Sequence, residues 1–324
     1  MHRSWLIVVA LSCLGLQASQ PATADEYPSK SITMIVPFTP GGGTDIMARL
    51  IAKNLSESLG KPVLVENKPG AGGIVGTDLA AHAAPDGYTL MLGSVSTISI
   101  NPSLYKNLTT DPLTELSPVA PFASTPSLLV VPLDLPVSSV QELIAYAKKQ
   151  PEGVNFASAG SGTSHHLSGE LFKSQAGIKA THIPYKGSAP APLGVIRGDA
   201  QFMIANVTSL TSAIEGRQVK AIAITSLERS PELPQYKTVA ESGLPGFEVI
   251  IWYGVFAPAK TPAAIINRLN AAITSIATLP EVRKVLRAEG AVPMTSSPEE
   301  FAARIQSDYR KWKTVVDASG AKAD

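Results

Sequence analysis

The sequence has a single cysteine, Cys13, so the chain cannot form an internal disulfide bond. A scaffold held together by disulfides is therefore excluded. With 324 residues, the chain is long enough to bury the cores of two ordinary domains without such bonds. Long apolar runs are also lacking, since no segment beyond the N-terminus approaches the ~20 apolar residues that span a bilayer. We expect the mature protein to be soluble.

The N-terminus has the features of an export signal. Arg3 lies in a short basic region, an apolar core runs from residue 5 to 16, and Ala22-Thr23-Ala24 is a small-x-small cleavage site. This pattern predicts a signal peptide over residues 1–24 and a periplasmic mature protein. A lipoprotein with Cys13 as its acylated first residue is the alternative, but it would have a very short apolar core and would leave the Ala-x-Ala site unused.

An excess of charge of either sign is also lacking. The chain has 27 Lys and Arg against 26 Asp and Glu. Removal of the predicted signal peptide takes away Arg3 and no acid, so 27 − 1 = 26 basic residues face 26 acidic ones. A neutral chain without a basic run argues against nucleic acid or an anionic membrane surface as a partner.

Segments with strand and helix patterns alternate along most of the chain, which predicts an α/β fold with mostly parallel sheets. Strands are expected at 32–38, 62–66, 88–92, 127–131, 153–158, 180–184, 200–205, 219–225 and 249–256. Helices are expected near 44–59, 74–84, 139–149 and 164–176, with a short one from Ser188. After residue 260 the pattern is helical, with helix starts at Thr261-Pro262, Pro280 and the capping box of Ser297-Pro298-Glu299-Glu300.

Two stretches of turn and linker composition bracket the middle of the chain, at 117–126 and 226–234. They predict one domain inserted into another, which would leave a hinged cleft between them. Domain 1 is expected to comprise residues 25–122 plus 228–324, including the C-terminal helices, and domain 2 residues 123–227.

The stretch "IVPFTPGGGTD" ends the first expected strand at three glycines, Gly41 to Gly43. They lead into a helix, whose start carries unpaired N–H groups and partial positive charge, and glycine lets an anion approach that backbone. Nucleotide motifs do not fit, because no Gly-Lys-Ser/Thr follows and Ile46 stands where the dinucleotide fingerprint has its third glycine. The loop thus favours a small anion. The alternative is a plain turn in which Thr44 caps the helix and the negative charge of Asp45 interacts favourably with the helix dipole.

Similar loops follow two later strands, at 93–97 and at 160–164 within "AGSGTSHHLSGELF". In open α/β sheets, ligands bind outside the carboxyl ends of strands, near helix starts. These loops are poor in Lys and Arg, so an anion would meet backbone N–H groups and hydroxyls. The hydroxyls concerned are those of Thr39, Thr44, Thr163 and Ser164. Such neutral hydrogen bonding favours reversible capture.

The sequence shows no catalytic set. No serine lies in a Gly-x-Ser-x-Gly elbow. The adjacent His165 and His166 would point about 100° apart on a helix, which is awkward for a shared metal ion. His82 and His182 have no carboxylate or cysteine cluster near them in the sequence. We therefore predict that the protein is not an enzyme and needs neither a metal nor a cofactor.

An ordered set of motifs resembles a known family. The segments are "YPSKSITMIVPFTPGGGTDIMARLIAKNL", "VENKPGAGGIVGTDLAAHAAPDGYTLMLGS", "NPSLYKNL", "FASAGSGTSHHLSGELF", "HIPYKGSAPA", "SPELPQYKTVAESGLPGFE" and "WYGVFAPAKTP". Together they resemble the Bug-type extracytoplasmic solute receptors of tripartite tricarboxylate transporters. The similarity extends from about Tyr27 to the final helix. Each motif alone is weak, but the ordered set is specific.

The resemblance implies a periplasmic binding protein of the type II, Venus-flytrap kind. Two α/β domains would close on a small organic acid and deliver it to integral membrane transport subunits, and the receptor would be a monomer. The ligand-binding residues implied on the first loop are Phe38, Gly41, Gly42 and Asp45, with Asp45 orienting the loop, and Ser94 follows a later strand. Those implied in the opposite domain are Ser158, Gly162, Thr163, Ser164, His166, Ala205 and Asn206.

One departure from the family pattern affects the ligand. Many relatives have an aspartate where this chain has Ala205, followed by the asparagine retained here as Asn206. Loss of that acid favours a dicarboxylate or aromatic acid over an amino acid. Two alternatives remain: an exported α/β enzyme that uses His165, His166 or Ser161 on a small acid, and a binding protein that serves a sensor kinase.

Overall fold

The computed structural model describes residues 27–188 and 190–321. The predicted signal peptide, with Cys13, lies outside the described residues. Within them, no helix is both long and apolar enough to cross a membrane.

The first half of the chain alternates strands and helices. Its elements are β1 (Ile32–Val36), α1 (Gly43–Leu59), β2 (Val63–Asn67), η1 (Ala71–Gly73), α2 (Ile74–Ala81), β3 (Thr89–Ser94), η2 (Ser96–Ile100), α3 (Asn101–Leu104), α4 (Pro112–Glu115), β4 (Leu116–Pro132), α5 (Val140–Lys149) and β5 (Val154–Ser158). The second half begins in the same way and ends in helices. Its elements are α6 (Ser164–Ala176), β6 (Ala180–Pro184), α7 (Ala191–Ile196), β7 (Phe202–Asn206), α8 (Val207–Glu215), β8 (Val219–Ile224), β9 (Ile250–Pro258), α9 (Ala263–Thr278), α10 (Pro280–Ala288), β10 (Val292–Pro293) and α11 (Pro298–Ser319).

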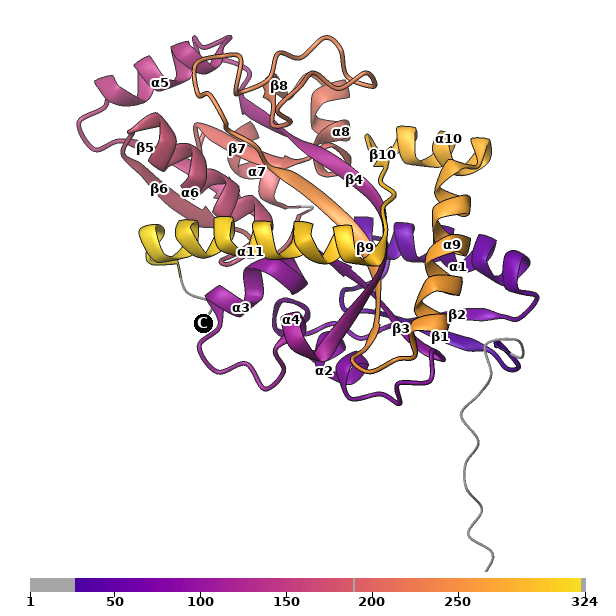
Figure 1. Cartoon of the computed structure of the whole chain (residues 1–324). Coiled ribbons are helices and arrows are strands. Elements are labelled where there is room, and N and C mark those ends of the chain that lie inside the picture. The colour runs from indigo at the N-terminus through magenta and orange to yellow at the C-terminus, as the bar shows by residue number, and fades with distance from the viewer. Residues whose placement is uncertain (1–26, 189, 322–324) are drawn as a thin grey trace, which may run out of the picture.

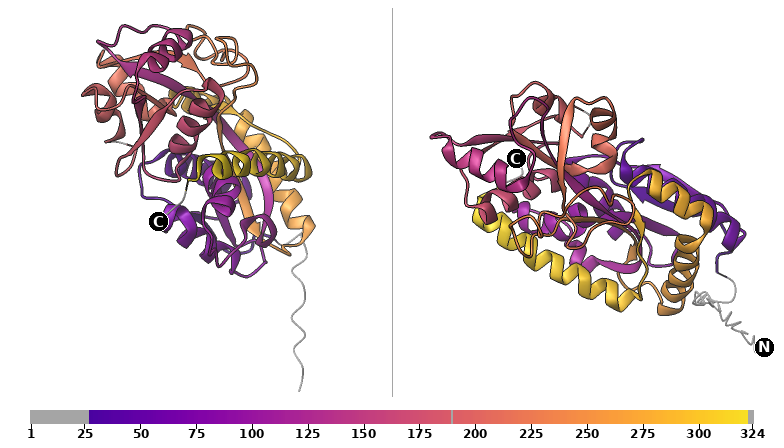
Figure 2. Two further views of the ribbon diagram at one scale, coloured as in Figure 1. Left: turned by 90° about the vertical axis from the view of Figure 1, so that its left-hand side faces the viewer. Right: turned by 90° about the horizontal axis from the view of Figure 1, so that it is seen from above.

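The strands form two lobes, which Figures 1 and 2 show. In the first lobe (residues 27–126 and 250–321), the order is β2-β1-β3-β9-β4, with β10 on β4. In the second lobe (residues 127–249, except 189), β4 continues and pairs with β7 and β8, and β5 and β6 follow β7. Strands β1, β2 and β3 of the first lobe pair in parallel, and so do β5, β6 and β7 of the second, as the sequence predicted. Strands β4 and β9 pair antiparallel to their neighbours, which include β8 and β10. The prediction of mostly parallel sheets was therefore wrong at the centre.

Strand β4 also corrects the linker prediction. The stretch at 117–126 was expected to be a linker because it contains Pro118, Pro121 and Pro126, yet it pairs with β9 along its length. Proline is tolerated at bulges, and the pairing register shifts between Pro118 and Ala120 and again after Pro121. One continuous strand thus connects the lobes, and its pairing changes between Pro126 and Ser127. The domain boundaries predicted from composition stay predictions.

The C-terminal helix α11 lies along both lobes. It contacts η2 and α3 in the first lobe and α6 in the second. Its buried side chains include Phe301, Ile305 and Trp312, which join the main apolar core. Ser297 and Glu300 form the predicted capping box at its start. The helix therefore packs against the junction of the two lobes.

Candidate functional site

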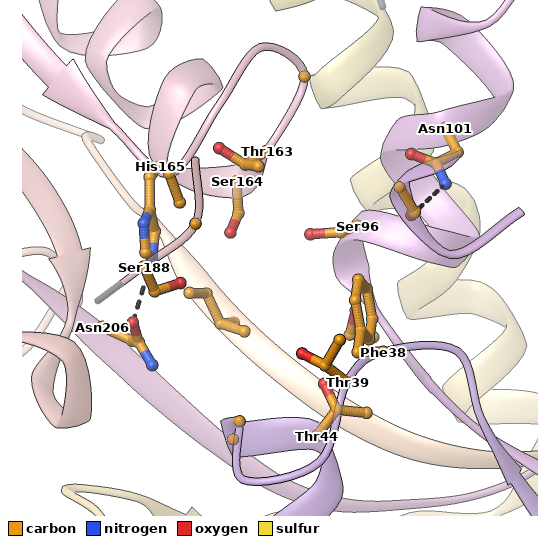
Figure 3. A pocket seen from close by; sticks show the side chains of 18 of the residues that line it. Phe38, Thr39, Thr44, Ser96, Asn101, Thr163, Ser164, His165, Ser188 and Asn206 are labelled. Atoms are coloured by element: carbon orange, nitrogen blue, oxygen red, sulfur yellow. Dashed lines mark hydrogen bonds between the residues drawn. The ribbon is translucent and has the colours of Figure 1, made fainter. Parts of the chain in front are cut away.

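A cavity of about 340 Å³ lies between the lobes. Figure 3 shows many of its lining residues. From the first lobe these are Phe38, Thr39, Gly42, Gly43, Thr44, Gly72, Ser94, Ser96, Asn101, Tyr105, Ile251 and Tyr253. From the second lobe they are Ala159, Ser161, Gly162, Thr163, Ser164, His165, Gly187, Ser188 and Asn206. None of these side chains is Asp, Glu, Lys or Arg.

The glycine loop brings the start of α1 to this cavity. The buried, β-branched strand β1 ends at Val36, and the helix begins at Gly43 with Gly42 as its N-cap. No side chain caps this helix start. The first N–H groups of a helix have no partner within the helix and carry partial positive charge. Since Gly42, Gly43 and Thr44 all line the cavity, this helix start is open to a ligand.

Asp45 holds the glycine loop in place and does not line the cavity. Its carboxylate accepts hydrogen bonds from the Gly41 N–H, the Arg49 guanidinium and the Asn67 amide, each 2.9 Å long. The Asn67 amide also donates to the Phe38 carbonyl. Burial alone would raise the pKa of Asp45, but the hydrogen bonds from Arg49, Gly41 and Asn67 lower it overall. Its predicted orienting role fits this position, and Gly41, its loop partner, also lies outside the lining.

The second lobe supplies a matching loop at the start of α6. The Thr163 hydroxyl accepts a hydrogen bond from the His166 N–H and donates to the Gly160 carbonyl at 2.8 Å, which makes Thr163 the N-cap. Ser164 follows, and its hydroxyl points into the cavity (Figure 3). The predicted residues Gly162, Thr163 and Ser164 are therefore brought together at the cavity. They face the glycine loop of the first lobe.

Ser158 and His166 lie behind this second loop. The Gly162 N–H donates a 3.0 Å hydrogen bond to Nδ1 of His166. The His166 ring stacks on that of His182, with centroids 3.8 Å apart. His182 Nε2 lies 2.6 Å from the hydroxyl of Ser158, which is fully buried at the end of β5. Both residues thus support the loop and do not line the cavity.

The imidazoles of this region are held neutral near pH 7. Burial lowers the pKa of His166 to about 4, assisted by the charge of Lys173. Burial, with contributions from His166 and Lys173, lowers the pKa of His182 to about 3. Neutral His166 can accept the Gly162 N–H at Nδ1, whereas the imidazolium could not.

Asn206 ends β7 and reaches the cavity, whereas Ala205 does not. Ala205 is fully buried and pairs with Leu128 of β4. The Asn206 amide oxygen lies 3.1 Å from Nε2 of His165 (Figure 3). Burial lowers the pKa of His165 to about 4, against a smaller opposing effect of that hydrogen bond. Ala205 was predicted to bind the ligand, but only its neighbour Asn206 lines the cavity.

Several lining residues were not identified from the sequence. Ser96 lies in a loop that was identified, two residues beyond Ser94. Asn101 begins the unpredicted helical turn α3 and donates to the Gly72 carbonyl, and Tyr105 follows that turn. Tyr253 lies on β9, and only the pairing of β9 with β3 and β4 brings it to the cavity. No local sequence signal could have identified these three.

The site offers neutral hydrogen-bond donors and no charged group. Two helix starts face the cavity from opposite lobes, and hydroxyl and amide side chains surround them. Such a site can hold an anion without a cationic side chain. Across residues 27–188 and 190–321, no group of three or more His, Cys, Asp or Glu is placed to hold a metal ion.

Comparisons with known proteins agree with this arrangement. A family model described as "Tripartite tricarboxylate transporter family receptor" matches residues 47–321. Protein BugT of Bordetella pertussis is 38% identical over 318 residues, which cover 98% of this chain and 97% of that protein.

Two solved structures from Rhodopseudomonas palustris are also similar. Rpa4515 with adipate is 34% identical with a TM-score of 0.82, covering 91% of this chain and 99% of that one. MatC with bound malate is 34% identical with a TM-score of 0.78, covering 90% of this chain and all of that one.

Proposed function

Because this chain belongs to the tripartite tricarboxylate transporter receptor family of solute-binding proteins, we propose that it captures a small dicarboxylic acid in the cavity between its lobes. It then delivers the acid to the integral membrane subunits of a transporter. Its fold is that of the periplasmic binding proteins, with two α/β lobes around a ligand cleft.

One observation carries the choice of a dicarboxylate. The starts of α1 and α6 face the same cavity from opposite lobes, and no charged side chain lines it. Each helix start favours one negative group. A molecule with a carboxylate at each end satisfies both. The adipate and malate bound by the two Rhodopseudomonas proteins are acids of this kind.

The proposed contacts are the predicted residues that line the cavity: Phe38, Thr39, Gly42, Ser94, Gly162, Thr163, Ser164 and Asn206. The other predicted residues support these contacts from behind or from the side: Gly41, Asp45, Ser158, His166 and Ala205. Aromatic acids rank second, since the rings of Phe38, Tyr105 and Tyr253 also line the cavity. An amino acid ranks last, because an ammonium group would meet no acidic side chain there.

Cleft closure accompanies capture in this proposal. The crossing strands β4 and β9 join the lobes, so a change of backbone near Pro126 and Ile250, where their pairing ends, would swing one lobe toward the other. The ligand is released unchanged, the protein works as a monomer, and residues 1–24 direct its export before removal.

A binding screen tests the proposal. The mature chain, unfolded and refolded to remove carried-over ligand, is mixed with mono-, di- and tricarboxylates, aromatic acids and amino acids, and its thermal midpoint is measured. A ligand at 100 times its Kd adds about 2.7 kcal/mol to stability, which moves the midpoint by several degrees. We expect shifts with dicarboxylates and unchanged acid on recovery by NMR. Folded protein that responds to no carboxylate would refute the proposal, and turnover of the acid would favour an enzyme.

A further inference from the structure

The side-chain amide of Asn206 has two polar neighbours, both of which lie against its oxygen. The Ser209 hydroxyl donates to Oδ1, and Nε2 of His165 lies 3.1 Å from the same atom. An amide oxygen can only accept hydrogen bonds. His165 must therefore carry its proton on Nε2 and donate it to Asn206.

The reversed amide would require the other tautomer of His165. Nε2 would then accept from the Asn206 NH₂ group, and the imidazole proton would move to Nδ1. That nitrogen is buried and has no hydrogen-bond partner among the described residues. A buried N–H without an acceptor is rare and costly. Full protonation is also disfavoured near pH 7, since burial holds the pKa of His165 at about 4.

The fixed amide turns its donor edge away from His165 (Figure 3). The start of α1, in the first lobe, lies close to that donor edge. A Cβ placed on Gly43 would lie 4.0 Å from Asn206 Nδ2 and 2.7 Å from the Tyr253 hydroxyl. The Asn206 N–H groups and the open N–H groups of α1 therefore converge on one part of the cavity, one set from each lobe.

A ligand atom at this place meets donors from both lobes and no acidic side chain. A carboxylate or hydroxyl oxygen can accept from them. An ammonium group has three donors and a positive charge, so it would face N–H groups and the positive end of a helix. This part of the cavity should therefore bind a ligand that has an oxygen here more tightly than a ligand of the same carbon skeleton that has an ammonium group here.

We propose that His165 is a positioning residue that holds the Asn206 amide with its donor edge in the cavity, and that this selects carboxylic acids over the corresponding amino acids. The inference rests on the proposed function, because it concerns the same ligand. It assigns the selectivity for the acid to the His165–Asn206 pair.

The test measures selectivity with matched ligands. Malate and aspartate share a skeleton and differ in hydroxyl against ammonium, and adipate and 2-aminoadipate differ by one amino group. Titration calorimetry on the ligand-free mature chain gives the Kd ratio for each pair. The wild-type protein should bind the acid without nitrogen at least 10-fold more tightly. His165→Leu, which frees the amide to turn, should narrow that ratio about 10-fold.

Two further variants separate positioning from packing. His165→Gln places a side-chain N–H near the position of Nε2 and should keep the wild-type ratio, whereas His165→Asn places it near Nδ1 and should behave like His165→Leu. Asn206→Asp presents only hydrogen-bond acceptors and should narrow the Kd ratio of each ligand pair at least as much as His165→Leu does. This variant still tests the proposal if His165→Leu does not fold. A purely structural role of His165 would weaken both ligands of a pair equally.

The outcomes are distinguishable. If the folded wild-type protein responds to no carboxylate in the binding screen, the proposed function fails and this inference fails with it. If it binds malate or adipate but His165→Leu and Asn206→Asp leave the ratios unchanged, only the inference is overturned. A wild-type preference for the amino acid of each pair would also overturn it.

Discussion

The carboxylate of Asp45 accepts a 2.9 Å hydrogen bond from the backbone N–H of Gly41, four residues before it. The second lobe repeats this relationship, since Nδ1 of His166 accepts from the N–H of Gly162, also four residues before it, at 3.0 Å. In both cases a side chain in the first turn of a helix holds the glycine loop that precedes the helix. The two loops that face the cavity are thus fixed from behind, which leaves the open start of α1 and the Ser164 hydroxyl for a ligand.

Asp45→Ala should therefore lower both stability and affinity. The change leaves the Gly41 N–H, the Asn67 amide and the Arg49 guanidinium without their shared acceptor. We expect a loss of about 1 to 3 kcal/mol in unfolding free energy and at least a 10-fold weaker Kd for the acid identified in the screen. Urea unfolding and calorimetry measure the two effects. Asp317→Ala, which removes an exposed partner of Lys313 on α11, is the control and should change neither.

Much of the fold could be predicted because its elements carry strong local signals. The helix at 164–176 and the strand at 180–184 have the expected bounds. The main failure was β4, where three prolines suggested a linker. Local composition could not reveal that bulges accommodate these prolines, because that depends on the pairing with β9.

The two glycine loops of the site were identified for a similar reason. A strand followed by glycines and a helix start is a local pattern, and both loops line the cavity. Tyr253 lines the cavity only through the pairing of β9 with β3 and β4, so no neighbouring residue marks its position. His165 follows Ser164 at an identified helix start, but its contact with Asn206 has no local signal. His165 was considered only as a catalytic or metal-binding candidate, since its bond to Asn206 joins residues 41 positions apart.

Replacing Thr163 by alanine should mainly lower stability, whereas replacing Ser164 by alanine should mainly lower ligand affinity. The Thr163 hydroxyl is engaged with Gly160 and the His166 N–H as the helix cap, so Thr163→Ala should cost about 1 kcal/mol of stability. The Ser164 hydroxyl points into the cavity, so Ser164→Ala should cost about 1 to 2 kcal/mol of affinity at nearly unchanged stability. Thermal unfolding and calorimetry on both variants check this. A Thr163→Ala protein with normal stability but weak binding would contradict the assignment.

Stability should fall as the pH is lowered from about 6.5 towards 4. The pKa of His165 and of His166 is lowered from 6.5 to about 4, and that of His182 to about 3. At a pH between the lowered pKa of the folded state and 6.5, the unfolded chain binds more protons than the folded one. The unfolding free energy therefore rises with pH in this range, and this contribution reaches its full size above about pH 6.5.

One pKa unit corresponds to about 1.4 kcal/mol, so His165 alone should cost about 3 kcal/mol of stability by pH 4, and the three imidazoles together should cost more. Urea unfolding at pH 7.5, 6.5, 5.5 and 4.5 measures it. His165→Gln removes one of the titrating groups and should flatten the profile. Equal stability at pH 7.5 and 4.5 would show that these imidazoles are not held neutral.

Asp308→Ala should reduce stability without changing the ligand contacts. Asp308 accepts hydrogen bonds from the Trp252 indole at 2.8 Å and from Arg304 at 2.9 Å. Trp252 is fully buried, whereas its sequence neighbours Ile251 and Tyr253 line the cavity. Successive side chains of a strand point to opposite faces of the sheet, so the Trp252 side chain points away from the cavity. We expect a loss of about 2 to 3 kcal/mol in unfolding free energy and a Kd within 2-fold of wild type. A large change in Kd would show that the packing of α11 affects the cavity.

Gly41 and Gly42 should respond differently to a side chain. Gly41 has φ +83°, a left-handed conformation in which alanine costs about 1 to 2 kcal/mol, although a Cβ there would meet no atom within 4 Å. Gly42 has φ −84° and ψ 167°, which valine adopts readily, and its nearest neighbour for a Cβ is the Thr39 carbonyl at 3.9 Å. Gly41→Ala should therefore lower the thermal midpoint. Gly42→Val should keep the midpoint and weaken binding at least 10-fold, because its side chain would occupy the ligand's approach to the open start of α1. If Gly42→Val bound the acid normally, the carboxylate would have to be held elsewhere in the cavity.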